Sequence, residues 1–408
     1  MKKKLFFIAI GILLIFAAAF CALFFADTGI PRLYLEGDIS EMHDKSDKRN
    51  IEFEYSSDSL NVSGYAQIKI QGNSSTIFEK KNYTLKFYED AEHTEKLRLD
   101  LGWGGEYEYC MKANWIDRTH SRNIVTARLV SQMQEKYALF TDAPCNGAID
   151  GFPVEIYING SFLGLYTFNI PKDAWLFNMD KDNPDHILVC SDSWEDTNLF
   201  MARPDFTLWE VEVGEESDAT LEKLNRLFDF VINSSDEEFR ANFEDYINLD
   251  SALNYYVMTD FTYMYDNTGK NMLLATYDGK LWYLALYDMD SSWGTDTEGR
   301  GLFPYKEQPL DMARNRLFAR MEELFAKELA ERYFELREDI LSEEHIMAEF
   351  NAFRDEIPFP SFFKEFVRWS SGWIRVPSDI PGYEYSQIEE YMDIVADRLD
   401  AKYAAMLG

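Results

Sequence analysis

Two short stretches in the second half of the chain carry residues suited to phosphoryl transfer. Asp266 is followed five positions later by Asn271, which is the spacing of the catalytic loop in protein kinases. In such a loop the aspartate orients the attacking hydroxyl and the asparagine binds a metal ion. A metal-binding carboxylate is then expected at the end of a nearby strand, and the apolar run 281–287 leads directly into Asp288 and Asp290.

Asp288 and Asp290 lie two positions apart, so on an extended chain both carboxylates face the same side. Two anions this close favour a cation between them, because otherwise one of them takes up a proton. Oxygen ligands suit Mg²⁺ or Mn²⁺, and Asn271 could complete the set. The alternatives are a solvated acidic turn at 288–290 and an Asn/Gly surface turn at 266–271.

A polar glycine loop in the first hundred residues is a candidate phosphate-binding element. Its residues are Gly72, Asn73, Ser74 and Ser75, and the nearby cations are Lys80 and Lys81. Glycine lets the backbone approach a phosphate, and hydroxyl, amide and ammonium groups can bind one. Arg122, in a polar cluster that opens a predicted helix, is a further anion-binding candidate. A hairpin turn and a helix N-cap with structural salt bridges are the alternatives.

Two periodic patterns divide the chain into a strand-rich first half and a helix-rich second half. Alternation predicts strands at 51–55, 65–70, 83–88, 152–158 and 162–168. Helical spacing predicts helices at 117–134, 221–233, 236–246 and 249–264, and over most of 310–408 apart from an aromatic loop at 358–384. We therefore expect an α+β chain with a β-rich lobe (30–172), an acidic, irregular connection (173–220) and a helical lobe that contains the catalytic hairpin (221–400).

The composition indicates a globular protein that does not bind nucleic acid. Hydrophobic residues make up 46% of the chain and aromatic residues 16%, which is enough for a packed core. The chain has 40 Lys and Arg against 72 Asp and Glu, a net charge of −32, and no basic run. An anionic substrate would therefore need metal ions or local positive charge.

The N-terminus predicts one transmembrane helix ahead of the folded domain. Three lysines precede an apolar run from Leu5 to Ala26, and these 22 residues are long enough to span a bilayer core of about 30 Å. The lysines would stay inside, which places the rest of the chain outside the cytoplasm. A cleaved signal peptide is the alternative, so residues 1–29 are expected to be an anchor or a signal peptide and the protein to be membrane-anchored or secreted.

Four ordered stretches of the sequence resemble the CotH kinase family, which is named for a spore coat protein. They are 71–75 with 80–83, 113–119 with 122–123, 157–160 with 164–166, and 266–271 with 287–290 and Gly294. The resemblance spans most of residues 30–400. It implies an atypical protein-kinase-like fold with two lobes, a β-rich N-lobe and a helical C-lobe.

The resemblance also implies a chemistry and a set of roles. ATP would bind with Mg²⁺ or Mn²⁺, and the substrates would be coat or secreted proteins phosphorylated on Ser or Thr. Asp266 would be the catalytic aspartate, and Asn271, Asp288 and Asp290 would surround the metal. The glycine loop and Lys81 would cover the phosphates.

The sequence therefore predicts an extracytoplasmic, membrane-anchored protein kinase. A second hypothesis is a non-catalytic surface pseudokinase that binds cell-wall or carbohydrate polymers. Its motivation is the N-terminal anchor together with a set of aromatic residues. These are Trp282, Trp293, Trp369, Trp373, Tyr383 and Tyr385.

Overall fold

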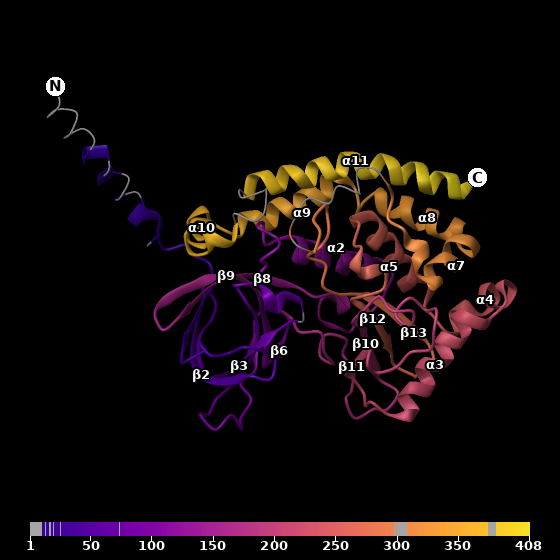
Figure 1. Cartoon of the computed structure of the whole chain (residues 1–408), viewed down its shortest axis with the longest axis horizontal. Coiled ribbons are helices and arrows are strands. Elements are labelled where there is room, and N and C mark those ends of the chain that lie inside the picture. Colours follow the sequence, from indigo (N-terminus) through magenta and orange to yellow (C-terminus); the bar gives the residue numbers. More distant parts are fainter. Residues whose placement is uncertain are drawn as a thin grey trace.

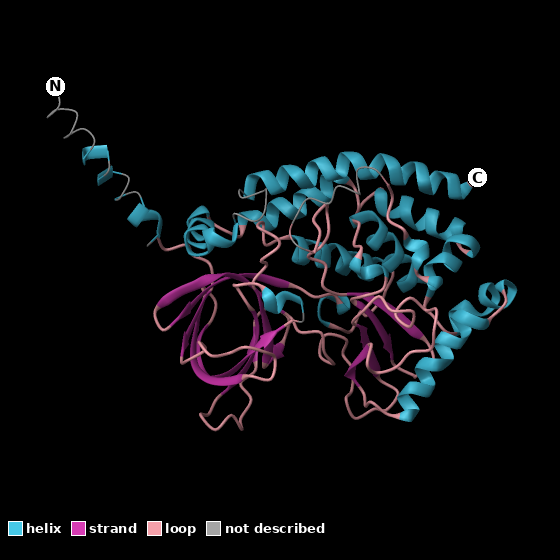
Figure 2. Cartoon of the chain, viewed as in Figure 1, coloured by secondary structure: helices cyan, strands magenta, loops and turns pink. Residues whose placement is uncertain are grey.

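The computed structural model describes residues 10–12, 14–15, 18, 20–24, 26–72, 74–297, 299, 308–373 and 381–408. The side chains of Ser74, 370–373 and 381–384 are outside this description. A barrel and a smaller sheet lie side by side beneath a layer of helices, as Figures 1 and 2 show.

Seven strands of the first 170 residues close into a barrel, in the order β1-β2-β3-β4-β7-β9-β8. They are β1 (Arg32–Glu36), β2 (Lys48–Ser56), β3 (Asn61–Gln71), β4 (Asn82–Tyr88), β7 (Glu108–Lys112), β8 (Gly151–Ile158) and β9 (Ser161–Asn169). β1 closes the barrel by pairing in parallel with β8, whereas the other neighbours are antiparallel. Alternating side chains fill the interior, among them the fully buried Leu33, Ile68, Leu85 and Phe168.

The predicted fold class, a kinase-like fold with a β-rich N-lobe, is wrong at this point, because the first part of the chain forms a closed seven-stranded barrel. Alternation predicts each of the main strands, but it does not say which strands pair. The closing contact joins Leu33 to Ile156, more than a hundred residues apart, and no local pattern encodes it.

A second, four-stranded antiparallel sheet follows the barrel in the order β11-β10-β12-β13. Its strands are β10 (Ile187–Ser191), β11 (Trp209–Val213), β12 (Met272–Thr276) and β13 (Trp282–Leu286). β10 and β11 fall in the stretch 173–220, where the sequence predicted irregular structure. A minor two-stranded sheet, β5 (Leu99–Asp100) and β6 (Gly105–Glu106), lies beside the barrel.

The helices gather mainly in the second half of the chain. They are α2 (Arg122–Lys136), α3 (Asp218–Asn233), α4 (Asp236–Asn242), α5 (Leu249–Thr262), α7 (Arg316–Leu324), α8 (Ala326–Arg337), α9 (Glu343–Asp355), α10 (Phe359–Trp373) and α11 (Pro381–Leu407). Short 3-10 turns are η1 (Ser74–Ile77), η2 (Pro144–Gly147), η3 (Phe243–Asp245), η4 (Asp266–Thr268) and η5 (Met312–Arg314). α10 occupies much of the stretch where an aromatic loop was predicted.

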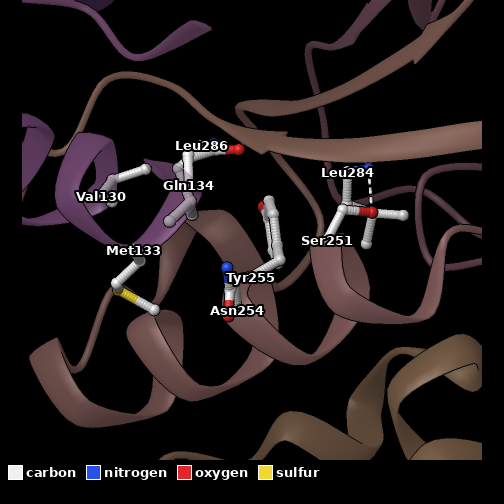
Figure 3. A pocket seen from close by; sticks show the side chains of 8 residues that line it. All are labelled: Val130, Met133, Gln134, Ser251, Asn254, Tyr255, Leu284 and Leu286. Atoms are coloured by element: carbon white, nitrogen blue, oxygen red, sulfur yellow. Dashed lines mark hydrogen bonds between the residues drawn. The ribbon is translucent and has the colours of Figure 1, made fainter. Parts of the chain in front are cut away.

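The helix layer is packed tightly against the second sheet. Figure 3 shows Val130 and Met133 of α2, Tyr255 of α5 and Leu284 of β13 around a space of about 10 Å³. Such a space holds one water at most. The hydroxyl of Ser251 on α5 accepts a hydrogen bond from the backbone N–H of Leu284 at 3.2 Å. This bond joins the helix to β13, the strand that leads into the predicted site.

The structure does not support the predicted N-terminal transmembrane helix. Residues 1–9 and several positions up to 25 lie outside the described part of the chain. Within the part that is described, no helix is both long enough and apolar enough to cross a bilayer.

α10 is fixed to the barrel by two adjacent buried ion pairs. Lys364 lies 3.0 Å from Glu155 of β8, and Glu365 lies 2.8 Å from Lys80, with all four side chains less than 5% exposed. The Lys80 ammonium also donates to the carbonyl oxygens of Ala113 and Leu165. Burial lowers the pKa of Lys80, and the charge of Glu365 opposes that shift.

Gly164 on β9 is required for this contact. A Cβ at position 164 would lie 2.8 Å from Cε of Lys80 and 3.1 Å from Oε2 of Glu365. The indole N–H of Trp369 on α10 donates to the carbonyl of Leu163 at 3.0 Å, next to the glycine. Any side chain at position 164 would therefore push α10 off the barrel.

We predict that Lys80→Met lowers the free energy of unfolding by about 3–5 kcal/mol, because it leaves Glu365 buried without a cation. Urea denaturation of single and double variants measures the effect. Lys80→Met/Glu365→Leu should recover most of the loss, since it removes the stranded charge as well. A loss below about 1 kcal/mol in the single variant, as for an exposed pair, would contradict this account.

Candidate active site

A cleft of about 360 Å³ runs between the barrel and the second sheet. Residues from β3, β4 and β7 line one wall, and residues from β10, β11 and the segment after β13 line the other. The four residues predicted to serve as catalytic base and metal ligands all line it. They are Asp266, Asn271, Asp288 and Asp290.

The loop that carries Asp266 is held by hydrogen bonds from three neighbouring elements. The Asn267 side chain donates to the carbonyl of Tyr287 at 3.0 Å, beside the end of β13. The Tyr255 hydroxyl of α5 donates to the carbonyl of Asn267 at 2.7 Å. The Asn315 side chain, which caps α7, donates to the carbonyl of Thr268 at 2.9 Å. These hydrogen bonds fix the loop to α5, to the end of β13 and to the cap of α7.

The far end of the same loop is fixed to β10. The backbone N–H of Asn271 donates to the carbonyl of Ser191 at 2.9 Å, and the Ser191 hydroxyl donates to the carbonyl of Gly269. Asn271 has a φ of 61°, a left-handed conformation that asparagine tolerates better than most residues. This conformation lets one short loop present both Asp266 and Asn271 to the cleft.

The chain turns sharply as it leaves β13. Asp288 has a φ of 53°, and the next residue, Met289, is fully buried. The backbone N–H of Met289 donates to the side-chain oxygen of Asn123 at 2.9 Å, which fixes the turn to the start of α2. Asp288 and Asp290, on either side of Met289, both line the cleft, as their i, i+2 spacing predicts.

Asp288 is close enough to the other two aspartates to shift their pKa values. Burial and then the charge of Asp288 raise the pKa of Asp290 to about 8. Burial raises the pKa of Asp266 to about 6; Lys270 opposes this shift, and Asp288 adds to it. Without a cation, the cleft therefore holds a proton on Asp290 at neutral pH.

Lys112 at the end of β7 is the cation nearest to the aspartates. Its ammonium lies 3.6 Å from Oδ1 of Asp288. Burial would lower the pKa of Lys112, but Tyr287 and Asp288 outweigh it and raise that pKa. Sequence analysis gave Lys112 no role, and it predicted no strand at β7, which ends at this residue.

Lys172 is a second cation of the cleft that sequence analysis missed. It pairs with Glu212 of β11, and its ammonium lies 4.8 Å from the centre of the Tyr287 ring. The nearby groups Tyr287 and Glu212 help raise the pKa of Lys172 despite its burial. Both walls of the cleft therefore carry an ionised lysine.

The predicted phosphate-binding loop reaches the cleft only in part. Gly72 and Ser75 line it, whereas Asn73 and the Ser74 side chain lie outside the described residues. Gly72 has a φ of 101°, and a Cβ there would meet the Ser75 hydroxyl oxygen at 2.0 Å. Only glycine fits this position, so the loop keeps a bare backbone at the mouth of the cleft.

The three predicted phosphate-binding cations have protein partners in the structure. Lys80 lines the cleft, but its ammonium is directed to Glu365 and two carbonyls, as described above. Lys81 donates to the carbonyls of Thr76 and Phe78 within the loop itself. Arg122 is fully buried, pairs with Asp117 at 2.7 Å and is not among the residues that line the cleft. Lys112 and Lys172 are better placed to contact an anion in this cleft.

The donor set fits a hard divalent cation. Asp288, Asp290 and Asn271 offer carboxylate and amide oxygens, which Mg²⁺ and Mn²⁺ prefer. Across the described ranges, no three His, Cys, Asp or Glu side chains are grouped so as to hold an ion by themselves. The protein would therefore supply part of the shell and leave the rest to water and phosphate, as is usual for Mg²⁺.

We predict that Mn²⁺ binding at pH 7 releases about one proton from Asp290, since the ion favours the ionised carboxylate. Calorimetry in two buffers with different ionisation enthalpies measures the proton count. Asp290→Asn should abolish the release. Equal heats in the two buffers for the unsubstituted protein would contradict the raised pKa.

The raised pKa values of Asp290 and Asp266 both contribute to the pH dependence of stability without metal, and that of Asp290 acts over the wider pH range. Between about pH 4 and pH 8 the folded protein keeps a proton on Asp290 that the unfolded chain has lost. Because the folded state then binds more protons, the free energy of unfolding should fall as the pH rises through this window. Chemical denaturation at several pH values should show this decline, and it should flatten in Asp290→Asn.

No curated protein matches the sequence at a significant level. The family model described as CotH kinase protein matches residues 68–397, which is most of the chain. The matched stretch contains Gly72, Lys112, the loop 266–271 and the turn 288–290. The resemblance found in the sequence is confirmed, and the chain belongs to the CotH kinase family.

Proposed function

We propose that the protein transfers a phosphoryl group from ATP to Ser or Thr hydroxyls of a protein substrate, with Mg²⁺ or Mn²⁺. One observation carries this proposal: Asp266, Asn271, Asp288 and Asp290 line one cleft together with Lys112. Membership of a kinase family supports the reaction class. The bound ion would neutralise phosphate charge and bridge the phosphates to the protein.

Asp266 is suited to position the acceptor hydroxyl. Its Oδ1 is buried and has no hydrogen-bond partner within the described structure, so an acceptor O–H could donate to it. A pKa of about 6 leaves most of the carboxyl ionised at neutral pH and able to accept the hydroxyl proton.

Lys112 is suited to contact a phosphate of the nucleotide. It lies beside Asp288, so phosphate oxygens bound near that carboxylate would come within its reach. In this partly buried cleft, a fixed ammonium stabilises negative charge more strongly than it would in water. Most of the rate gain would come from such positioning and charge neutralisation.

Most of the aromatic residues that motivated the non-catalytic alternative do not lie on the surface. Trp282, Trp293, Trp369 and Tyr385 are buried and cannot form a polymer-binding platform as they stand. The side chains of Trp373 and Tyr383 lie outside the described part. Location outside the cytoplasm and coat or secreted substrates remain proposals that rest on the N-terminal sequence and on the family.

We predict that ATP with Mn²⁺, at about 100 times the dissociation constant, adds about 2.7 kcal/mol to the free energy of unfolding. Thermal unfolding with and without the ligands measures this stabilisation. Asp288→Ala should abolish it, whereas Asp278→Ala, on the β12–β13 turn outside the cleft, should keep it. No stabilisation of the unsubstituted protein would remove the nucleotide site from the proposal.

We predict that Asp266→Asn retains nucleotide binding and loses phosphoryl transfer by about a hundredfold or more, because the amide cannot take the hydroxyl proton. Incorporation of labelled phosphate into candidate acceptor proteins measures transfer, and the thermal assay measures binding. Equal incorporation by the two proteins would show that Asp266 is not the base.

A further inference from the structure

Two cations lie near enough to the carboxylate of Asp266 to act on its charge. Lys270 lies on the same loop as Asp266, and Arg314 lies in η5, which the chain reaches much later. Both act on Asp266, since their charges lower its pKa against the effect of burial. Lys270 lines the cleft together with Asp266, so an acceptor that reaches this carboxylate would come near the charge of Lys270.

The two cations are seated on an aromatic pair. The Lys270 ammonium lies 5.5 Å from the centre of the Trp194 ring, and the Arg314 guanidinium lies 4.6 Å from the centre of the Tyr265 ring. The two rings are 5.9 Å apart and tilted by 52°. Tyr265 directly precedes the catalytic aspartate and is 48% exposed. We call these four residues the acceptor platform.

The platform is built on fixed backbone. A Cβ at Gly269 would lie 3.0 Å from the Trp194 ring and 2.8 Å from Leu199, so the loop and the 194–199 segment are in close contact. Asn315, next to Arg314, holds the loop through the carbonyl of Thr268. The cations are therefore positioned by the same contacts that position Asp266.

Neither cation of the platform forms an ion pair with a carboxylate in the described structure. Lys112 and Lys172, by contrast, have acidic partners inside the cleft. In a chain of net charge −32, cations without such partners beside a reactive group are unusual. Glu195 and Asp196 are close in sequence to Trp194, yet the described ion pairs do not join either of them to Lys270 or Arg314. The positive charge of the platform is therefore available to a ligand.

We propose that the platform docks an anionic side chain of the acceptor polypeptide, close in sequence to the Ser or Thr that receives the phosphate. This inference rests on the proposed kinase function. Lys270 and Arg314 would bind the anionic group, and the exposed face of Tyr265 would pack against the backbone or an apolar neighbour. The anion is a carboxylate of Asp or Glu or the phosphate of a residue already phosphorylated.

Peptide binding without turnover tests this inference. Labelled peptides of one sequence, with Glu, Gln, Lys or phosphoserine beside a single serine, are titrated by fluorescence anisotropy with Mn²⁺ and a non-hydrolysable ATP analogue. We expect the Glu peptide to bind about tenfold more tightly than its Gln twin, as for one charge-assisted contact. Comparison of the Glu and phosphoserine peptides tells which anion is preferred.

A charge-matched pair of variants isolates the platform. Lys270→Gln/Arg314→Gln should lose the preference for the anionic peptides. Lys280→Gln/Lys327→Gln removes two positive charges at exposed positions outside the cleft and should keep it. The same affinity for the Glu and Gln peptides, or a preference that survives in the first variant, would overturn the inference.

The outcome is separable from that of the proposed function. A protein that is stabilised by Mn²⁺ and ATP but treats all four peptides alike refutes the platform and leaves the kinase proposal intact. A protein that binds neither nucleotide nor anionic peptide refutes both. The Lys270→Gln/Arg314→Gln variant could instead slow transfer to all four peptides equally and leave their affinities unchanged. That result would show that these cations act on the phosphoryl group and not on the peptide.

Discussion

The constraint on which the structure depends is the presence of three carboxyl groups in one partly buried cleft. Burial and then the charge of Asp288 keep a proton on Asp290 at neutral pH, and the same two effects raise the pKa of Asp266. Such an arrangement is unfavourable for an isolated protein and becomes favourable when a cation binds. The surrounding structure keeps the three carboxylates together against this repulsion. Helices α5 and α2, the end of β13 and a capping asparagine all form hydrogen bonds with the loop or the turn that carries them.

The two halves of the molecule supply different parts of the site. The second sheet and α5 position the carboxylates, whereas the barrel contributes Lys112 and the bare backbone at Gly72. Neither half contains a complete site. The helix α10 adds a link, because Glu365 holds Lys80 at the edge of the same cleft. Displacement of α10 would break two buried ion pairs, Lys80–Glu365 and Glu155–Lys364. The shape of the barrel side of the cleft therefore depends on a helix that does not line the cleft.

The catalytic and metal-binding candidates could be predicted because their signals are local. The spacing of Asp266 and Asn271 and the strand that precedes Asp288 are visible in short windows of sequence. The roles given to Lys80, Lys81 and Arg122 required knowledge of their partners, and those partners are not local signals. Glu365, for example, lies 285 positions from Lys80. The same reason explains why barrel closure was missed, while most individual strands were predicted correctly.

The charge of the cleft also bears on the order in which ligands bind. A nucleoside triphosphate that approaches the free protein would come near the carboxylates of Asp288 and Asp266. Lys112 already pairs with Asp288. Lys112 and Lys172 already face carboxylates, so we expect the divalent cation to enter with the phosphate or before it. A bound ion would make the end of the cleft with the three aspartates attract phosphate, which these carboxylates otherwise repel. Because the pKa of Asp290 is raised, binding of the ion would require this carboxyl group to lose its proton. The protonation of Asp290 would therefore link the binding of metal and nucleotide to the pH.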